Sequence, residues 1–275
     1  MTFIDLAGRA MKALAAVAFL FVVAVPASAD PSTSPTASRT DRPPCDTALD
    51  LVRLDVHLKH VSQRIAAHEP VTIVALGSSS TAGAGASAPD NSYPARLGVE
   101  LRTLFPGQAF NIINKGVNGE EVTDMLRRFD EAVIANKPDL VVWQLGTNSL
   151  IRDHEMTDRG ALIRQGLNKV RAARADTILV DPQYAPKVVV KPQAVKMVKF
   201  LSAFAKEENI AMFRRFLMMK RWTEIDRLPY SAFVTPDDLH MNDFGYGCMA
   251  KGLALAIADS VRRPIVSAKV VAPAK

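Results

Sequence analysis

Long hydrophobic runs are almost absent from this chain. The apolar stretch 13–25 is too short to span a bilayer comfortably, and no other stretch approaches about 18 uninterrupted apolar residues. Two basic residues precede this stretch, and residues 27–29, Ala-Ser-Ala, have the small-x-small form of a signal-peptidase site. We therefore expect residues 1–29 to be a signal peptide and the mature protein to be periplasmic or secreted, with no stable membrane insertion. A retained membrane anchor is the alternative.

Cysteine is equally scarce, since Cys45 and Cys248 are the only two in 275 residues. Neither has a second ligand at a spacing typical of zinc sites, so we expect no metal centre. In an oxidising compartment an even pair suggests one disulfide, which would join the start of the domain to its end. Two independent buried thiols are the alternative, because pairing cannot be deduced from sequence alone.

Aromatic residues make up 7% of the chain and are not interleaved with basic ones, so we expect no binding of single-stranded nucleic acid. The formal net charge is +6, and it falls to +5 without residues 1–29, which hold two basic residues and one acidic residue. One basic cluster spans residues 214–221. A solvated surface is its simplest interpretation, and attraction to an anionic glycan or envelope surface is the alternative.

The remaining composition, 48% hydrophobic and 23% charged, is typical of a folded globular chain. Residues 30–44 are rich in proline, serine and threonine and have little to bury, so we expect a flexible tether there. The folded domain is expected over residues 45–263, followed by a C-terminal tail over 264–275. An apolar stripe in residues 51–65 predicts an amphipathic helix that ends before Pro70.

Beyond this helix, strand and helix patterns alternate. Short apolar runs without polar alternation, typical of parallel strands buried on both faces, span residues 71–76, 109–113, 140–145, 177–180 and 210–213. Helical stripes lie between them, over residues 122–133, 162–170 and 194–201. This order predicts an α/β fold, a three-layer α/β/α sandwich with a central parallel sheet.

Polar and glycine-rich blocks follow the first three predicted strands. They are Gly77-Ser78-Ser79, the segment 116–119 (Gly-Val-Asn-Gly) and the segment 146–148 (Gly-Thr-Asn). Ligands of parallel sheets bind outside the carboxyl ends of the strands, so these blocks should share one rim. A phosphate-binding loop over residues 77–85 is disfavoured, because this segment lacks the Gly-Lys-Ser/Thr ending.

A serine hydroxyl becomes a useful nucleophile when a histidine, itself oriented by a carboxylate, removes its proton. Downstream, Asp237-Asp238-Leu239-His240 offers such a pair, with Asp238 competing with Asp237 as the orienting residue. These four blocks in this order resemble the SGNH (GDSL-like) hydrolases. The resemblance covers residues 70–260 and implies a flavodoxin-like sandwich of the SGNH hydrolase type.

The resemblance also implies roles for particular residues. Ser79 would be the nucleophile, His240 the base and Asp237 the residue that orients the base. The oxyanion hole would combine the backbone N–H groups of Ser79 and Gly119 with the side-chain amide of Asn148. Gly116 is a less favoured alternative to Gly119.

Two positions depart from the family pattern, since Ser78 and Ser149 stand where aspartates are usual. A hydroxyl can still form supporting hydrogen bonds there, although the substrate becomes less certain. Gln183 and Tyr184, after the fourth strand, would either meet a polar leaving group or form a structural turn.

The function implied is an exported serine esterase that cleaves short-chain O-esters, with acetyl esters of carbohydrate as leading candidates, through an acyl-enzyme and without a cofactor. The alternatives are an O-acyltransferase acting on a glycan and a catalytically silent glycan-binding protein. The expected partner is a small-molecule or glycan ester, and the oligomeric state is left open. Short residues over 82–86 favour a small acyl group.

Overall fold

The structure is a computed structural model that describes Cys45 and residues 49–154 and 159–263. The expected signal peptide, the tether and the C-terminal tail lie outside the described residues. None of the helices in the described part of the chain is long and apolar enough to cross a membrane.

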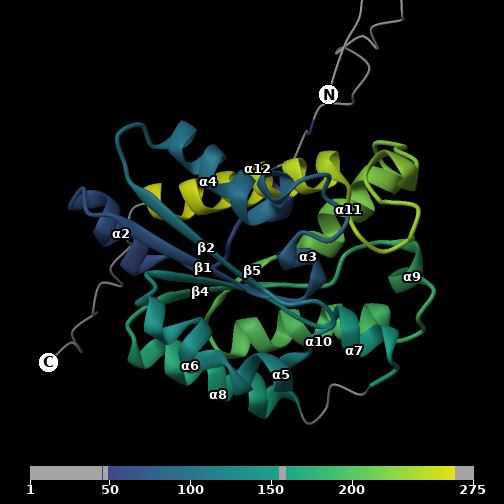
Figure 1. The fold of residues 1–275 in the computed structure, drawn as a ribbon, viewed down its shortest axis with the longest axis horizontal. Coiled ribbons are helices and arrows are strands. Elements are labelled where there is room, and N and C mark those ends of the chain that lie inside the picture. The colour runs from purple at the N-terminus through teal and green to yellow at the C-terminus, as the bar shows by residue number, and fades with distance from the viewer. Residues whose placement is uncertain (1–44, 46–48, 155–158, 264–275) are drawn as a thin grey trace, which may run out of the picture. The chain divides into compact units, whose positions relative to one another are not determined.

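A parallel sheet of five strands forms the centre of the domain (Figure 1). The strands are β1 (Val71–Gly77), β2 (Phe110–Gly116), β3 (Leu140–Gln144), β4 (Asp176–Val180) and β5 (Ala211–Phe213). Their spatial order is β2-β1-β3-β4-β5, so the chain reverses direction across the sheet between β1 and β3. In flavodoxin-like sheets this switch point is where ligands bind.

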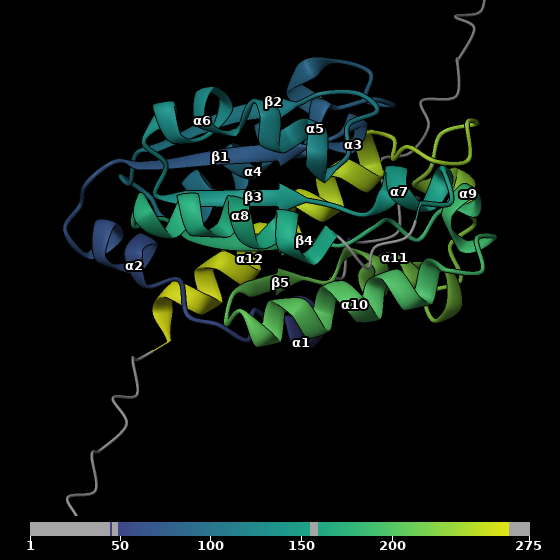
Figure 2. The same cartoon turned by 90° about the horizontal axis from the view of Figure 1, so that it is seen from below.

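Helices cover both faces of the sheet, and the expected three-layer α/β/α sandwich is confirmed. On one face lie α1 (Leu49–Val52), α2 (Lys59–Ala66), α4 (Tyr93–Leu104), α11 (Arg215–Glu224) and α12 (Asp243–Arg262). On the other lie α5 (Val122–Arg127), α6 (Phe129–Ala132), α8 (Arg159–Ala172) and α10 (Ala194–Glu207). Figure 2 shows α8 and α10 in front of the strands.

Shorter helices lie mainly in the loops that follow the strands. They are α3 (Ser79–Ala82), α7 (Thr147–Ile151) and α9 (Pro186–Val189), with 3₁₀ turns η1 (Pro89–Asn91), η2 (Ile134–Asn136) and η3 (Tyr230–Ala232).

Alternate residues of each strand contribute to the hydrophobic cores on opposite faces of the sheet. In β1, Ile73 and Ala75 belong to the core beneath α4 and α12, whereas Val74 and Leu76 belong to the core beneath α5 and α8. All four are fully buried. Because successive side chains point to opposite faces, a strand with two buried faces needs an unbroken apolar run.

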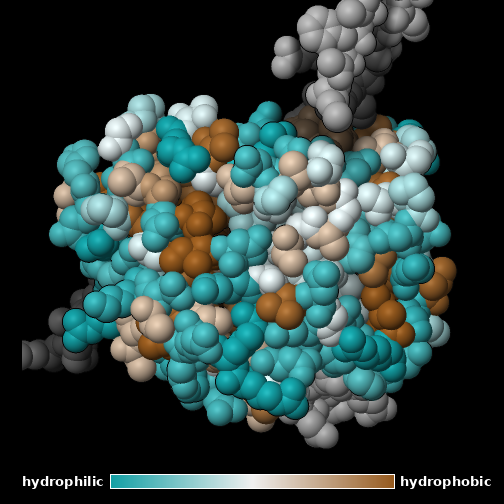
Figure 3. Space-filling model, viewed as in Figure 1, coloured by the Kyte–Doolittle hydropathy of each residue, from teal (hydrophilic) through white to brown (hydrophobic). Residues whose placement is uncertain are grey.

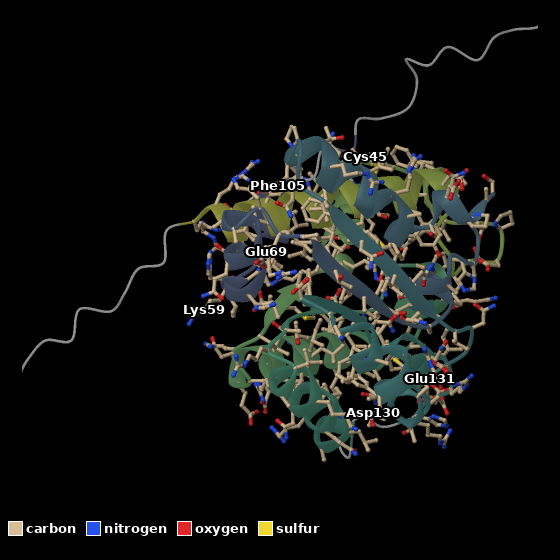
Figure 4. The ribbon with its side chains drawn as sticks, turned by 60° about the vertical axis from the view of Figure 1, so that its left-hand side comes forward. Cys45, Lys59, Glu69, Phe105, Asp130 and Glu131 are labelled. Atoms are coloured by element: carbon tan, nitrogen blue, oxygen red, sulfur yellow. A yellow bond between two sulfur atoms is a disulfide. The ribbon has the colours of Figure 1, made fainter. Side chains whose placement is uncertain are left out.

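The disulfide Cys45–Cys248 is confirmed, with a Cα–Cα distance of 5.2 Å and a sequence separation of 203. It joins the start of the described domain to the buried side of α12. Figure 4 places Cys45 on the α12 side of the sheet and Asp130 and Glu131 on the opposite side.

The single helix predicted over residues 51–65 is wrong, because the chain forms α1 and α2 with a break between them. Residues in this break bond to the last helix instead of to their own helical neighbours. The backbone N–H of Leu58 donates to Ser260 Oγ at 3.0 Å, and His57 Nδ1 lies 2.6 Å from the Ser260 carbonyl oxygen.

The stripe over residues 122–133 is likewise divided into α5 and α6. The division falls at Arg128, whose guanidinium binds both oxygens of the Glu120 carboxylate at 2.6–2.9 Å and the Lys115 carbonyl oxygen at 2.8 Å. This residue therefore ties the start of the helical segment to the end of β2.

Candidate active site

Ser79 is the first residue of α3, directly after the central strand β1. Its neighbours Ser78 and Ser80 are 2% and 1% exposed, whereas Ser79 is only partly buried. Of these three serines, Ser79 is thus the one that a substrate can reach. Gly77 allows the tight turn, since a Cβ there would lie 2.2 Å from Thr81 Oγ1.

His240 reaches Ser79 from a loop that lies far along the chain. His240 Nε2 is 2.8 Å from Ser79 Oγ, and His240 Nδ1 is 2.5 Å from Asp237 Oδ2. An Nδ1–H that donates to the carboxylate leaves Nε2 to accept a proton from the hydroxyl. The three side chains therefore form a continuous hydrogen-bonded chain.

The loop that carries this pair is held by the second oxygen of Asp237. Asp237 Oδ1 accepts from Thr235 Oγ1 at 2.6 Å and from the backbone N–H groups of Leu239 and His240, each at 2.9 Å. Partial burial alone would raise the pKa of this carboxyl, but the bonds from Thr235, His240 and Leu239 outweigh burial and lower the pKa. Asp237 is therefore ionised at neutral pH.

Asp238, the competing carboxylate, occupies a different place. Its backbone has a φ of 60°, its N–H donates to the Thr235 carbonyl oxygen, and its own carbonyl accepts from the N–H of Lys187. Among the described residues, its exposed carboxylate hydrogen bonds to none. The structure brings Asp237, and not Asp238, to His240.

Asn148 lies in α7, after β3, on the other side of the topological switch point. Its Nδ2 donates to the carbonyl oxygen of Glu120 at 2.8 Å. An amide nitrogen carries two hydrogens, so the second remains free to donate to a substrate. This hydrogen bond fixes Asn148 next to the segment 116–119, which contains Gly119.

The two glycines of that block have different surroundings. Gly116 ends β2 against α3, where a Cβ would lie 2.1 Å from the backbone nitrogen of Ala82. Gly119 has a φ of 78° and precedes Glu120, whose carbonyl holds Asn148. Gly116 therefore serves close packing, and Gly119 lies in the turn beside Asn148.

Both serines that replace the usual aspartates are engaged. The N–H and hydroxyl of Ser78 each donate to Gln144 Oε1 at 2.9 Å, which joins the nucleophile turn to the end of β3. The hydroxyl of Ser149 donates to Glu121 Oε2 at 2.8 Å. Hydrogen bonds thus persist at both positions, with Gln144 and Glu121 as partners that the sequence interpretation did not identify.

Gln183 and Tyr184 follow β4. Gln183 is 1% exposed, its Oε1 accepts from Thr147 Oγ1 at 2.8 Å, and its Nε2 donates to the Leu239 carbonyl at 3.2 Å. It therefore links α7 to the His240 loop as a structural element. Tyr184 donates its hydroxyl to Glu224 Oε1 at 3.2 Å.

Arg215 contradicts the interpretation of the cluster 214–221 as a wholly solvated surface. Its side chain is fully buried, and its Nε donates to the Asp181 carbonyl at 2.9 Å. Asp181 is buried beside it, and desolvation raises the pKa of its carboxyl to about 7. Arg214, by contrast, pairs at the surface with Asp55.

Two buried tyrosines contact α3 and the turn after it from the same side of the sheet. The hydroxyl of Tyr93 lies 3.2 Å from Thr81 Oγ1, and that of Tyr246 donates to the Ala84 carbonyl at 2.6 Å. Burial raises the pKa of Tyr93 to about 12, so it keeps its proton at neutral pH.

The part of the chain that the structure describes holds no group of three or more His, Cys, Asp or Glu side chains that is arranged to hold a metal ion.

Comparison with known proteins finds esterases that are similar to this chain. An acetylxylan esterase from Geobacillus stearothermophilus is 36% identical over 56 residues, which are 20% of this chain and 26% of that protein. A two-domain esterase active on acetylated mannans superimposes with a TM-score of 0.66 at 22% identity, over 78% of this chain and 57% of the other. The chain thus spans little more than half of that enzyme.

A catalytic mutant of an acetylxylan esterase from Geobacillus stearothermophilus superimposes with a TM-score of 0.57 at 20% identity, over 70% of this chain and 94% of the other. At these identities the two structural matches show a shared fold. A model of the Non-GDSL lipase-like family matches residues 44–263. Because this match covers most of the chain, the protein belongs to the Non-GDSL lipase-like family, and its resemblance to the GDSL-like hydrolases is confirmed.

Proposed function

We propose that this protein is an exported serine esterase that removes acetyl groups from carbohydrate through an acyl-enzyme intermediate. The observation that carries the proposal is the hydrogen-bonded series from Ser79 Oγ to His240 (2.8 Å) and from His240 to Asp237 (2.5 Å). The acetyl and carbohydrate parts rest on what the similar esterases are described as cleaving.

In the first half of the reaction, Ser79 Oγ attacks the ester carbonyl while His240 Nε2 takes its proton. Asp237 holds the imidazole with its proton on Nδ1 and stabilises the imidazolium. When the tetrahedral intermediate collapses, His240 returns the proton to the departing sugar oxygen. Water then attacks the acetyl-enzyme by the same route and releases acetate.

The negative charge on the attacked oxygen needs donors that are already in place. Ser79 begins α3, where a backbone N–H has no acceptor inside its helix. The second amide hydrogen of Asn148 and the N–H of Gly119 complete the proposed oxyanion hole. The bond from Asn148 to Glu120 stabilises the relative position of these last two donors.

Hydrolysis is favoured over acyl transfer by the openness of the site. The side chains of His240 and Asp237 are 17% and 44% exposed, so water can reach the acyl-enzyme.

Close packing of the turn that follows α3 favours a small acyl group. A Cβ on Gly85 would lie 2.5 Å from the Met241 carbonyl oxygen, so the turn after α3 packs directly on the chain beside His240. Hydrophilic and intermediate colours predominate around α3 and α7 on the face shown in Figure 3. Brown groups are also visible on this face, one of them near α9.

A substrate panel tests the proposal. We expect kcat/KM on p-nitrophenyl acetate to exceed that on p-nitrophenyl octanoate by at least about tenfold, because the extra methylenes do not fit. Acetate should also be released from acetylated xylo- or manno-oligosaccharides. Higher kcat/KM on the octanoate, or transfer of acetyl to a glycan without net release of acetate, would contradict the proposal.

The oxyanion role of Asn148 leads to a separate prediction. Asn148→Ala should lower kcat by about 10²- to 10³-fold, the usual cost of one lost oxyanion donor, with a much smaller change in KM. Steady-state kinetics on p-nitrophenyl acetate measure both quantities. Asn136→Ala is the matched control, because Asn136 also uses its Nδ2 to bond a backbone carbonyl, that of Ala132, but lies on η2 away from the site. Equal kinetics for the two variants would remove Asn148 from the oxyanion hole.

A further inference from the structure

A buried carboxylate joins the Gly119 turn to α7. Glu121 is 7% exposed, and its two oxygens accept from Ser149 Oγ at 2.8 Å and from Arg152 Nη1 at 2.9 Å. His154 Nδ1 lies 3.0 Å from the same oxygen as Arg152. The Glu121 carboxylate therefore holds one end of the Arg152 guanidinium in place.

The other end of this guanidinium lies beside Gly119. The Arg152 side chain is 46% exposed, and a Cβ on Gly119 would lie 3.4 Å from its Nη2. Among the described residues, Nη2 hydrogen bonds to none. Since Gly119 is a proposed oxyanion donor, Nη2 lies next to the proposed oxyanion hole.

Charge indicates which kind of group Arg152 meets. Its positive charge is already balanced by Glu121 at 2.9 Å, and Arg128 is balanced by Glu120, the residue before Glu121, at 2.6 Å. A compensated guanidinium that keeps free N–H groups suits a neutral acceptor oxygen better than a carboxylate. The hydroxyl and ring oxygens of a sugar are acceptors of this kind.

We propose that Arg152 is a specificity-determining residue whose Nη2 donates to an oxygen of the sugar that carries the acetyl group. This inference rests on the proposed function. Anchoring of the turn does not depend on Arg152 alone, because Ser149 also binds Glu121, and Glu121 and Asp124 form a capping box at the start of α5.

Two variants test the inference, Arg152→Gln and Arg152→Lys, each assayed with acetylated xylo-oligosaccharides and with p-nitrophenyl acetate. A hydrogen bond from a charged donor corresponds to about 10- to 100-fold in kcat/KM. Arg152→Gln should therefore lose at least about tenfold more kcat/KM on the oligosaccharides than on p-nitrophenyl acetate, whose alcohol part has no sugar oxygen. Arg152→Lys should lose less, because its ammonium keeps a charged donor.

Arg127→Gln is the matched control, because Arg127 is 71% exposed and, within the described part of the chain, its ion pair is with Asp124 of its own helix. This variant should have the same kcat/KM as the wild type on both substrates. Equal losses on both substrates for Arg152→Gln, or no loss on either, would overturn the inference while leaving the proposed esterase intact. A wild-type enzyme that cleaves p-nitrophenyl acetate but no acetylated sugar would overturn both the substrate class and the role of Arg152.

Discussion

Ser79→Ala is expected to abolish covalent labelling by a fluorophosphonate and to lower kcat by about 10⁴- to 10⁶-fold. The hydroxyl of Ser79 has His240 Nε2 as its hydrogen-bond partner, so its removal leaves the packing of α3 unchanged. Thermal unfolding of the variant should therefore match that of the wild type. Active-site labelling, read by intact mass, measures the loss directly.

Ser80→Ala provides the control within the same turn. Ser80 is 1% exposed, so a fluorophosphonate cannot reach it, and this variant should still be labelled once at Ser79. Labelling of Ser79→Ala at any serine of the turn, or turnover close to that of the wild type, would show that the nucleophile lies elsewhere.

Asp237→Asn should lower kcat by about 10³- to 10⁴-fold, whereas Asp238→Asn should have little effect. In Asp237→Asn, the amide oxygen can keep the three bonds that Asp237 Oδ1 accepts, from Thr235, Leu239 and His240. The amide nitrogen would then replace Oδ2 and donate to His240 Nδ1. This places the imidazole proton on Nε2, where it blocks removal of the Ser79 proton.

Asp238→Asn is a matched control, because asparagine tolerates the left-handed backbone at this position (φ 60°). The measurement is kcat on p-nitrophenyl acetate for both variants, with circular dichroism as a check on folding. A larger loss for Asp238→Asn would reverse the assignment. A loss below about tenfold for Asp237→Asn would remove the carboxylate from the proposed mechanism.

Strand positions could be predicted from the sequence because a parallel strand that is buried on both faces needs a short, uninterrupted run of apolar residues. The predicted run 71–76 corresponds to β1 (Val71–Gly77), and 140–145 corresponds to β3 (Leu140–Gln144). Every side chain of such a strand meets a core, so the pattern holds whatever surrounds it. The residues that follow each strand then had to lie on one rim.

Helix continuity could not be read in this way. The apolar stripe over 51–65 gave no sign of a break, because Leu54 and Leu58 are fully buried whether or not they are helical. The break depends on hydrogen bonds from residues 57 and 58 to Ser260, which is more than 200 residues away. Similarly, the basic cluster gave no sign that Arg215 is buried while Arg214 lies at the surface.

By itself, the sequence determined the α/β/α order of elements and the four blocks that carry Ser79, Gly119, Asn148 and His240. These features are local. The disulfide between Cys45 and Cys248 was one of two possibilities in the sequence, and the structure decided it by bringing the two cysteines together. Only the tertiary structure decided that Asp237 rather than Asp238 meets His240, and that Glu121 and Arg152 lie beside Gly119. These contacts depend on the backbone direction of loops that are held in place by other loops. Contacts between loops leave no periodic pattern in the sequence.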